Sequence, residues 1–214
     1  MQRPDLDAAD ATPRLAPLPP RSWPPEMREA LAPLTPPVPR APGQPKGLNL
    51  LGTFALHPEL TRSYHVFVAH VLYRSTLTPR HRELLILRVA VARGAAYEWA
   101  QHVLLATEAG LRRQEVVALS DGTGDVTWEP LEAALLAAVD ELLADACIAD
   151  ETWAVLAAGL SDQQLMDLVF TVGAYDLLAM AMRSFGVQVD DDLRTWLAMH
   201  LDQNDDQNDD QNDD

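Results

Sequence analysis

The stretch from Leu77 to Gly110, LTPRHRELLILRVAVARGAAYEWAQHVLLATEAG, constrains this chain more than any other. Thr78 followed by Pro79 is typical of a helix N-terminus, because threonine can accept a hydrogen bond from a free backbone N–H group and proline fits the first helical turn. Gly94 interrupts the apolar run, and glycine readily takes the left-handed conformation that ends many helices. The stretch therefore predicts two antiparallel helices joined by a tight turn at Arg93-Gly94.

The rest of the chain also favours helices. Ala and Leu dominate, glycine is rare at 10 of 214 residues, and no segment alternates with the period of a strand. We expect an all-α fold, a helical bundle with this antiparallel pair at its centre. Apolar periodicity, prolines and N-cap residues predict the other helices near residues 48–55, 58–74, 113–119, 130–145, 150–158, 162–185 and 190–198.

Both ends of the chain differ from this helical region. Residues 1–46 hold thirteen of the sixteen prolines, which predicts a mostly extended, Pro-rich arm. Within it, Trp23 and the residues after it suggest either one short docked helix or a free linker. Residues 201–214 repeat Asp, Gln and Asn with nothing to bury, so we expect an acidic disordered tail. The helical domain is therefore predicted over residues 47–200.

Charge and composition exclude several classes of protein. The net charge is −16, the tail supplies seven of these charges, and no basic cluster is present, so we expect no nucleic-acid binding. No uninterrupted apolar run reaches 18 residues and the N-terminus does not resemble a signal peptide, so we expect a cytoplasmic protein with no membrane partner. The single cysteine, Cys147, cannot form an internal disulfide.

Three ionisable residues are predicted to meet in the central hairpin. Glu98 and His102 are four residues apart and so share one helix face. At 1.5 Å per residue, Glu83 lies roughly 15 Å below the turn on one helix, and His102 roughly 12 Å below it on the other. A carboxylate beside an imidazole fixes its tautomer and favours its protonated form, which suits proton transfer near neutral pH. A buried ion pair that only joins two helices is the structural alternative.

The hairpin resembles a known family. Glu83, the triplet Tyr97-Glu98-Trp99 and His102 are similar to the signature of the carboxymuconolactone decarboxylase and alkylhydroperoxidase D superfamily. The segment LSDQQLMDLVFTVGAYDLLAMAMRSFGVQVDDDL resembles the C-terminal helix of its longer members, so the likeness covers about residues 47–195. The resemblance implies an all-helical fold of the alkylhydroperoxidase D type, and a homo-oligomer, trimer or hexamer, with active sites at or near subunit contacts.

The resemblance carries two different chemistries, and the sequence departs from one of them. In the peroxidase branch a Cys-x-x-Cys pair precedes the histidine; by spacing to His102 those cysteines would stand at Ala95 and Glu98. Because such a peroxidase needs a thiolate nucleophile, peroxiredoxin-type activity is disfavoured. The decarboxylase branch uses no thiol and no cofactor. It removes carbon dioxide from a small dicarboxylate lactone and reprotonates the carbon.

We therefore expect a cofactor-independent, carboxymuconolactone-decarboxylase-like enzyme acting on a small carbonyl or carboxylate compound. His102 is the candidate general acid/base, Glu83 its orienting carboxylate and Glu98 a second proton carrier or polar contact. Candidate substrate-binding residues are Tyr97, Trp99, Arg88 and Gln101, although core packing is an alternative for both aromatic side chains.

The candidate residues leave other interpretations open. A buried arginine such as Arg88 needs a carboxylate partner, which either the protein or a substrate can supply. We expect no metal, since no short ligand motif such as HExxH is present. The other hypotheses are a redox protein using an unusual or intermolecular thiol, and a non-enzymatic oligomeric binding protein.

Overall fold

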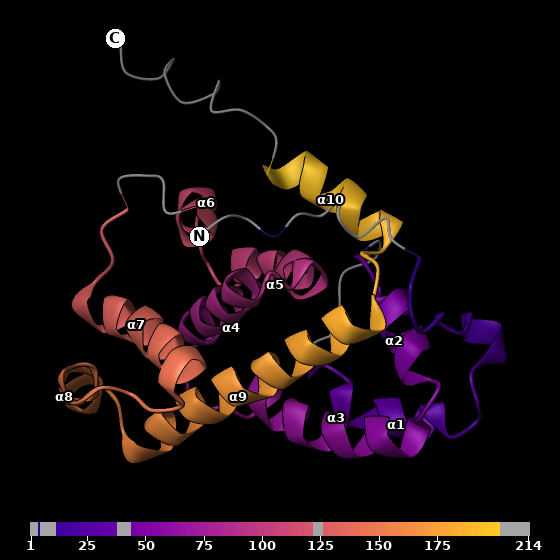
Figure 1. Cartoon of the computed structure of the whole chain (residues 1–214), viewed down its shortest axis with the longest axis horizontal. Helices are drawn as coiled ribbons and strands as arrows, with labels where there is room; N and C mark the ends of the chain where they lie inside the picture. The colour runs from indigo at the N-terminus through magenta and orange to yellow at the C-terminus, as the bar shows by residue number, and fades with distance from the viewer. Residues whose placement is uncertain (1–3, 5–11, 38–43, 122–125, 202–214) are drawn as a thin grey trace, which may run out of the picture.

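The computed structural model describes residues 4, 12–37, 44–121 and 126–201, and all regular structure within them is helical (Figure 1). The all-α prediction is confirmed. In chain order the helices are η2 (Pro20–Ser22), α1 (Met27–Leu31), η3 (Ala32–Leu34), α2 (Leu48–Phe54), α3 (Pro58–Tyr73), α4 (Pro79–Arg93), α5 (Ala96–Glu108), α6 (Arg113–Asp121), α7 (Pro130–Asp145), α8 (Asp150–Gly159), α9 (Asp162–Phe185) and α10 (Asp191–Leu201).

Local sequence signals set the helix ends where they were predicted. The Thr78 hydroxyl accepts a hydrogen bond from the His81 N–H group at 3.1 Å, and Pro79 is the first residue of α4. Gly94 ends α4 with φ of 60°, a left-handed conformation that costs glycine nothing. Ser161 and Gln164 form a reciprocal capping box at the start of α9.

Helix α4 is the centre of the bundle. It packs against α5, α6, α7 and α9, and the side chains Leu84 to Leu87 are fully buried on all its faces. A helix that is apolar all round has no face left for solvent, so it must be enclosed by neighbours. Its hairpin partner α5 lies beside it and is covered on another side by α10 (Figure 1).

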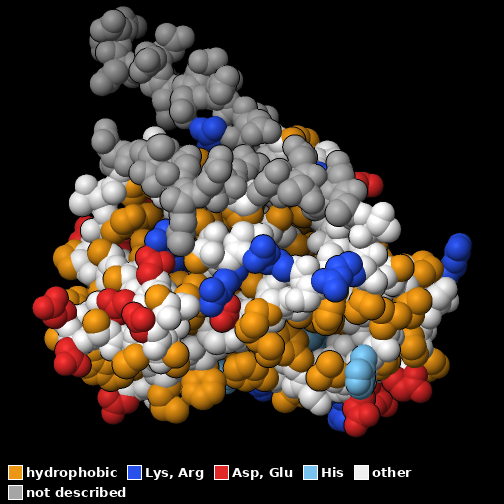
Figure 2. All heavy atoms as spheres, in the orientation of Figure 1, with side chains coloured by type: hydrophobic (Ala, Val, Ile, Leu, Met, Phe, Trp, Pro, Cys, Tyr) orange, Lys and Arg blue, Asp and Glu red, His pale blue; other side chains and the backbone are white. Residues whose placement is uncertain are grey.

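Helices α3 and α9 form a second layer. Both pack against each other, and α9 also packs on α4. By length and composition α9 alone, among the described residues, is apolar enough to cross a membrane, although it is largely the core helix of this bundle. Its outward side carries exposed apolar residues, and Figure 2 shows hydrophobic side chains gathered along the lower part of the molecule, over α3 and α9.

The described part of the Pro-rich arm, residues 12–37, lies against the bundle, and we call it the N-terminal strap. The strap contains α1 as well as two 3-10 helices, so it is more ordered than the extended arm that its prolines suggested. The Arg14 N–H group donates to the Phe185 carbonyl at 2.9 Å, and the Leu18 N–H group to the Gly52 carbonyl at 3.0 Å. Met27 and Ala30 are buried against Ala55. The predicted acidic tail lies outside the described residues, apart from Leu201 at the end of α10.

Candidate functional site

The central hairpin brings Glu83 and His102 together. The Nδ1 atom of His102 lies 2.7 Å from Oε2 of Glu83, and both residues are buried. Because a carboxylate can only accept, Nδ1 carries the hydrogen and donates it to Glu83. The remaining nitrogen, Nε2, makes no hydrogen bond with any described residue, and His102 lines a cavity. Counting residues from the turn predicted that Glu83 and His102 lie level with each other on the two helices, and their side chains are in contact.

Arg82 completes this group of charges. Its Nε atom donates to Oε1 of Glu83 at 3.0 Å, while Nη1 donates to the Leu72 carbonyl at 2.8 Å. Glu83 has no exposed surface and accepts from a guanidinium on one oxygen and from an imidazole on the other. This partnering offsets the cost of burying the carboxylate and holds it in one orientation.

A cavity of about 740 Å³ opens in front of His102. Helices α2, α3, α5 and α9 supply its wall, and the strap covers one side. The lining is mostly apolar, with polar groups near the histidine; its residues are Leu31, Leu34, Thr35, Pro36, Gln44, Pro45, Lys46, Gly47, Leu50, Leu51, Phe54, Tyr64, His65, Val68, Leu72, Tyr97, Gln101, His102, Leu105, Tyr175 and Leu178. Concave, largely apolar sites of this size with a few converging polar groups are typical of small-molecule binding.

Tyr175 reaches His102 from α9. The two rings meet edge to face with centroids 4.8 Å apart, and Tyr175 is almost fully buried. Burial, reinforced by the charge of Glu83, raises the pKa of Tyr175 well above its usual value, so its hydroxyl keeps the proton. That hydroxyl forms no hydrogen bond with a described residue, and the side chain lines the cavity. It is therefore a donor available to a ligand beside His102.

Tyr97 and Gln101 line the cavity one helical turn from each other. The Tyr97 hydroxyl donates to Asp190 at 2.8 Å, which ties α5 to the start of α10. A Cβ atom on Gly47 would lie 3.2 Å from the Tyr97 hydroxyl and 3.5 Å from Nε2 of Gln101, and φ of Gly47 is +70°. A glycine is therefore needed where the chain passes this corner of the cavity. Gln101 lines the cavity, although its amide nitrogen is buried and has no hydrogen-bond partner among the described residues.

Glu98 is separated from the other two candidate catalytic residues. It is 1 % exposed, neither carboxyl oxygen has a hydrogen-bond partner, and it does not line the cavity. Burial, with the nearby charge of Asp176, raises its pKa well above the ordinary value and so favours the protonated form of Glu98. Sharing a helix face with His102 did not bring its carboxyl group into a hydrogen bond with the imidazole, whose Nδ1 pairs with Glu83 instead.

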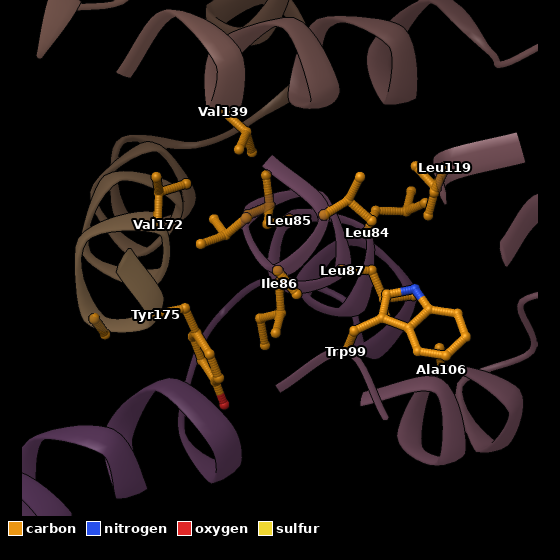
Figure 3. Packing of buried hydrophobic residues seen from close by; sticks show 14 of the residues in the cluster. Leu84, Leu85, Ile86, Leu87, Trp99, Ala106, Leu119, Val139, Val172 and Tyr175 are labelled. Atoms are coloured by element: carbon orange, nitrogen blue, oxygen red, sulfur yellow. The ribbon is translucent and has the colours of Figure 1, made fainter. Parts of the chain in front are cut away.

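Two candidate substrate-binding residues lie elsewhere. Trp99 is buried in the core, and Figure 3 shows it beside Leu87 and Ala106, away from Tyr175. Arg88 donates from Nε and Nη2 to the two oxygens of Asp140 on α7, at 2.8 and 2.6 Å. Its carboxylate partner therefore comes from the protein, and neither side chain lines the cavity.

The two histidines on α3, His65 and His70, form no hydrogen bond with His102 on α5. Nδ1 of His65 lies 2.8 Å from the Ala30 carbonyl of the strap, and burial lowers the pKa of this imidazole. His70 pairs with Asp167 at 2.9 Å. Within the described ranges, no three His, Cys, Asp or Glu side chains are grouped so that they could hold a metal ion.

Several residues of the site carried little signal in the sequence. Tyr175 lies in a helix that its sequence predicts to be buried, and Arg82 is one of four arginines in the first helix of the hairpin. Leu31, Leu34 and Lys46 reach the cavity from the strap and the segment before α2. Only the packing of distant segments shows that they belong to it.

Comparison with known proteins agrees with this geometry. The model of the carboxymuconolactone decarboxylase family matches residues 58–141, which include the whole hairpin. A search of curated proteins finds no significant match.

Solved structures share the fold at low sequence identity. An uncharacterised peroxidase-related protein from Ralstonia eutropha, with an alkylhydroperoxidase AhpD core, has 15 % identity and a TM-score of 0.69 over 86 % of this chain and 96 % of its own. The debrominase Bmp8, in complex with 2,3,4-tribromopyrrole, has 18 % identity and a TM-score of 0.67 over 88 % and 98 %. A protein of unknown function from Agrobacterium tumefaciens, with a suggested role as antioxidant defence protein AhpD, has 24 % identity and a TM-score of 0.59 over 64 % and 94 %. Residues 58–141 therefore match the carboxymuconolactone decarboxylase family, and the chain has the same fold as these alkylhydroperoxidase D-like structures.

Proposed function

We propose that this protein is a cofactor-independent acid/base enzyme with lyase-type chemistry on a small carbonyl compound. The observation that carries the proposal is the 2.7 Å contact between Glu83 and His102 at the wall of a cavity of about 740 Å³. A base oriented by a buried carboxylate and facing a ligand-sized cavity has the geometry that general acid/base catalysis requires.

The chemistry follows from the hydrogen bonds. With Nδ1–H donated to Glu83, neutral His102 has a lone pair on Nε2 that can take a proton from the carbon next to a substrate carbonyl. The C–H electron pair then forms the double bond of an enolate, and the carbonyl π electrons move to oxygen. The Tyr175 hydroxyl, which stays protonated, donates a hydrogen bond to that oxygen.

A β-keto acid would react by the same electron flow. Its bond to the carboxylate carbon breaks, carbon dioxide leaves, and the electron pair forms the enolate. Protonated His102 then gives its proton to the carbon, which releases the ketone. The net reaction consumes one proton for each carbon dioxide that forms.

Two other functions find less support. Thiol peroxidase chemistry lacks its nucleophile, because Ala95 and Glu98 stand at the expected positions, while Cys147 lies exposed in the turn between α7 and α8. A purely structural His102 predicts a histidine enclosed by aliphatic side chains. The cavity instead places Tyr97, Gln101 and Tyr175 around it.

The test compares the wild-type protein with His102→Gln in two assays, decarboxylation of β-keto acids and exchange of ketone α-protons for deuterium. We expect the substitution to lower both rates by about 10²- to 10⁴-fold, the usual contribution of a general acid/base. His70→Gln is the matched control, since the same substitution is made at a histidine that pairs with Asp167 and does not line the cavity. Equal rates in wild type and His102→Gln would refute the proposal.

A further inference from the structure

The cavity wall has a composition that selects among carbonyl compounds. Its apolar surface includes Leu50, Leu51, Phe54, Val68, Leu72 and Leu105, and beyond the polar group around His102 its other polar lining residues are Thr35, Gln44, Lys46, Tyr64 and His65. These apolar side chains come from α2, α3 and α5 and face one another across the cavity. An apolar wall of this kind favours a ligand with an apolar body, because burying that body removes hydrocarbon surface from water.

Cations for an anionic substrate are scarce at this site. Of the lysines and arginines in the described residues, only Lys46 lines the cavity, and it is exposed at the edge. Arg82, which shares Glu83 with His102, donates to Glu83 and to the Leu72 carbonyl. Arg88 and Arg93 pair with Asp140 and Asp176. Among the described lysines and arginines, a ligand carboxylate would therefore find only Lys46, at the edge of the cavity.

A ligand with two carboxylates does not fit this distribution of charge. If one carboxylate contacts Lys46, the second has no described lysine or arginine in the lining to pair with, and an unpaired buried charge is strongly unfavourable. The buried carboxylate of Glu83 and the net charge of −16 add repulsion.

We infer that the substrate is a carbonyl compound with an apolar body, an aromatic ring or a branched chain, and at most one anionic group. The inference rests on the proposed function for its carbonyl group, which His102 and Tyr175 would address. It differs from the dicarboxylate lactone that the family name suggests, and it assigns the apolar wall of α2, α3 and α5 to recognition of the substrate body.

Three β-keto acids separate the relevant properties. Benzoylacetate has one carboxylate and an aromatic body, acetoacetate has one carboxylate and a small body, and 3-oxoglutarate has two carboxylates. For each acid, kcat/KM is divided by the rate constant of its spontaneous decarboxylation. We expect this ratio to be at least about tenfold larger for benzoylacetate than for either of the others. A preference for 3-oxoglutarate would overturn the inference.

Binding measured without turnover distinguishes this inference from the proposed function. Calorimetry on His102→Gln would compare the neutral ketone 4-phenyl-2-butanone with glutarate, and we expect binding of the ketone only. If the ketone binds but wild-type protein accelerates no probe, the proposed function fails while the ligand class holds. Tighter binding of glutarate would refute the ligand class, even where His102-dependent turnover persists.

Two substitutions test the parts of the wall. Lys46→Gln should weaken benzoylacetate binding several-fold and leave ketone binding unchanged, since only the acid contacts the ammonium group. Leu105→Lys would add a cation to the apolar wall and should shift the preference toward 3-oxoglutarate by about tenfold or more. Unchanged preferences in folded Leu105→Lys protein, with its helical circular dichroism preserved, would show that this wall does not contact the substrate.

Discussion

At the scale of single residues, two buried glutamates have opposite hydrogen-bonding environments. Glu83 accepts hydrogen bonds from Arg82 and His102, and it orients the imidazole toward the cavity. Glu98 has no hydrogen-bond partner among the described residues, and burial raises its pKa and favours the protonated form. The two carboxyl groups therefore have different environments, and only Glu83 is paired with the histidine.

Tyr175→Phe should lower turnover and preserve the fold. The substitution removes only the hydroxyl, which has no partner in the described part of the chain, so the edge-to-face contact with His102 remains. Loss of one hydrogen bond to a developing enolate typically costs about 10²- to 10³-fold in kcat. Steady-state kinetics on a β-keto acid measures this effect. A variant with undiminished kcat would remove Tyr175 from the mechanism.

Glu98 predicts a specific dependence of stability on pH. Because its pKa is raised in the folded state, the folded protein holds this proton where the unfolded chain has released it. The free energy of unfolding contributed by Glu98 is therefore complete below the unfolded pKa, near 4.5, and declines as pH rises toward the folded pKa.

Glu98→Gln removes this decline. We expect the variant to gain at least about 1 kcal/mol over wild type between pH 5 and pH 8, since an amide needs no ionisation to match the unfolded state. Urea denaturation at the two pH values measures the difference. Exposed Glu151 on α8 provides the matched control, because Glu151→Gln should leave the dependence unchanged. Parallel pH profiles for wild type and Glu98→Gln would contradict this account of Glu98.

At the scale of elements, the strap completes the cavity. Leu31 and Leu34 form part of the cavity wall, and the strap is tied to α3 through His65 and Tyr73, whose side chains contact the carbonyls of Ala30 and Leu34. Its upstream end lies directly on α2, where the Leu18 N–H group donates to the Gly52 carbonyl. The strap thus encloses the site, although its prolines alone do not indicate such a role.

Gly52→Ala should displace the strap. An added Cβ atom would lie 2.5 Å from the Leu18 carbonyl oxygen and 2.9 Å from Cβ of Pro17. Neither atom belongs to a flexible side chain, so the strap backbone would have to shift. We expect a loss of about 1–3 kcal/mol in stability, as for other overpacked sites, and faster amide exchange in α1. Hydrogen–deuterium exchange resolves the second effect.

Gly173→Ala is the control for that substitution. Gly173 is also helical, but an added Cβ atom there meets nothing within 4 Å. This change should leave exchange in α1 unaffected and stabilise α9 slightly, because alanine is the better helix former. If α1 exchanges at wild-type rates in Gly52→Ala, the strap does not depend on close contact with α2.

At the scale of the whole molecule, an apolar face remains uncovered. Helices α3 and α9 expose Phe67 and Phe170, whose rings meet edge to face, and the face extends over Met166, Leu177 and Met180. Contiguous exposed apolar surface of this kind marks contact sites in soluble proteins (Figure 2). We propose that this face joins copies of the chain in a homo-oligomer, consistent with the trimer or hexamer that the family resemblance implies.

Phe170→Glu should reduce the molar mass measured by light scattering to that of a smaller assembly. A glutamate at the centre of the face would lose its hydration on association, so dissociation becomes favourable. Trp153→Glu changes an exposed aromatic residue on α8, away from this face, and should not alter the mass. A monomeric wild-type protein would disprove the proposal.

The sequence by itself determined the helices and one contact of the site. Thr78, Gly94 and Ser161 act on their own neighbours, so they define helix ends wherever the helices pack. Glu83 and His102 also follow from the chain alone, since a tight turn makes their depths on the hairpin a matter of counting along two helices.

Only the tertiary structure decided the partners of the remaining site residues. Several features of the site depend on segments far apart in the chain. Tyr175 contacts His102, Arg88 pairs with Asp140, and the strap covers the cavity, whereas Glu98 has no hydrogen-bond partner. Such contacts depend on how helices cross and slide against one another, and many crossings suit the same apolar pattern. Local periodicity therefore specifies which side of a helix is buried, whereas packing of the whole bundle specifies what each buried side chain meets.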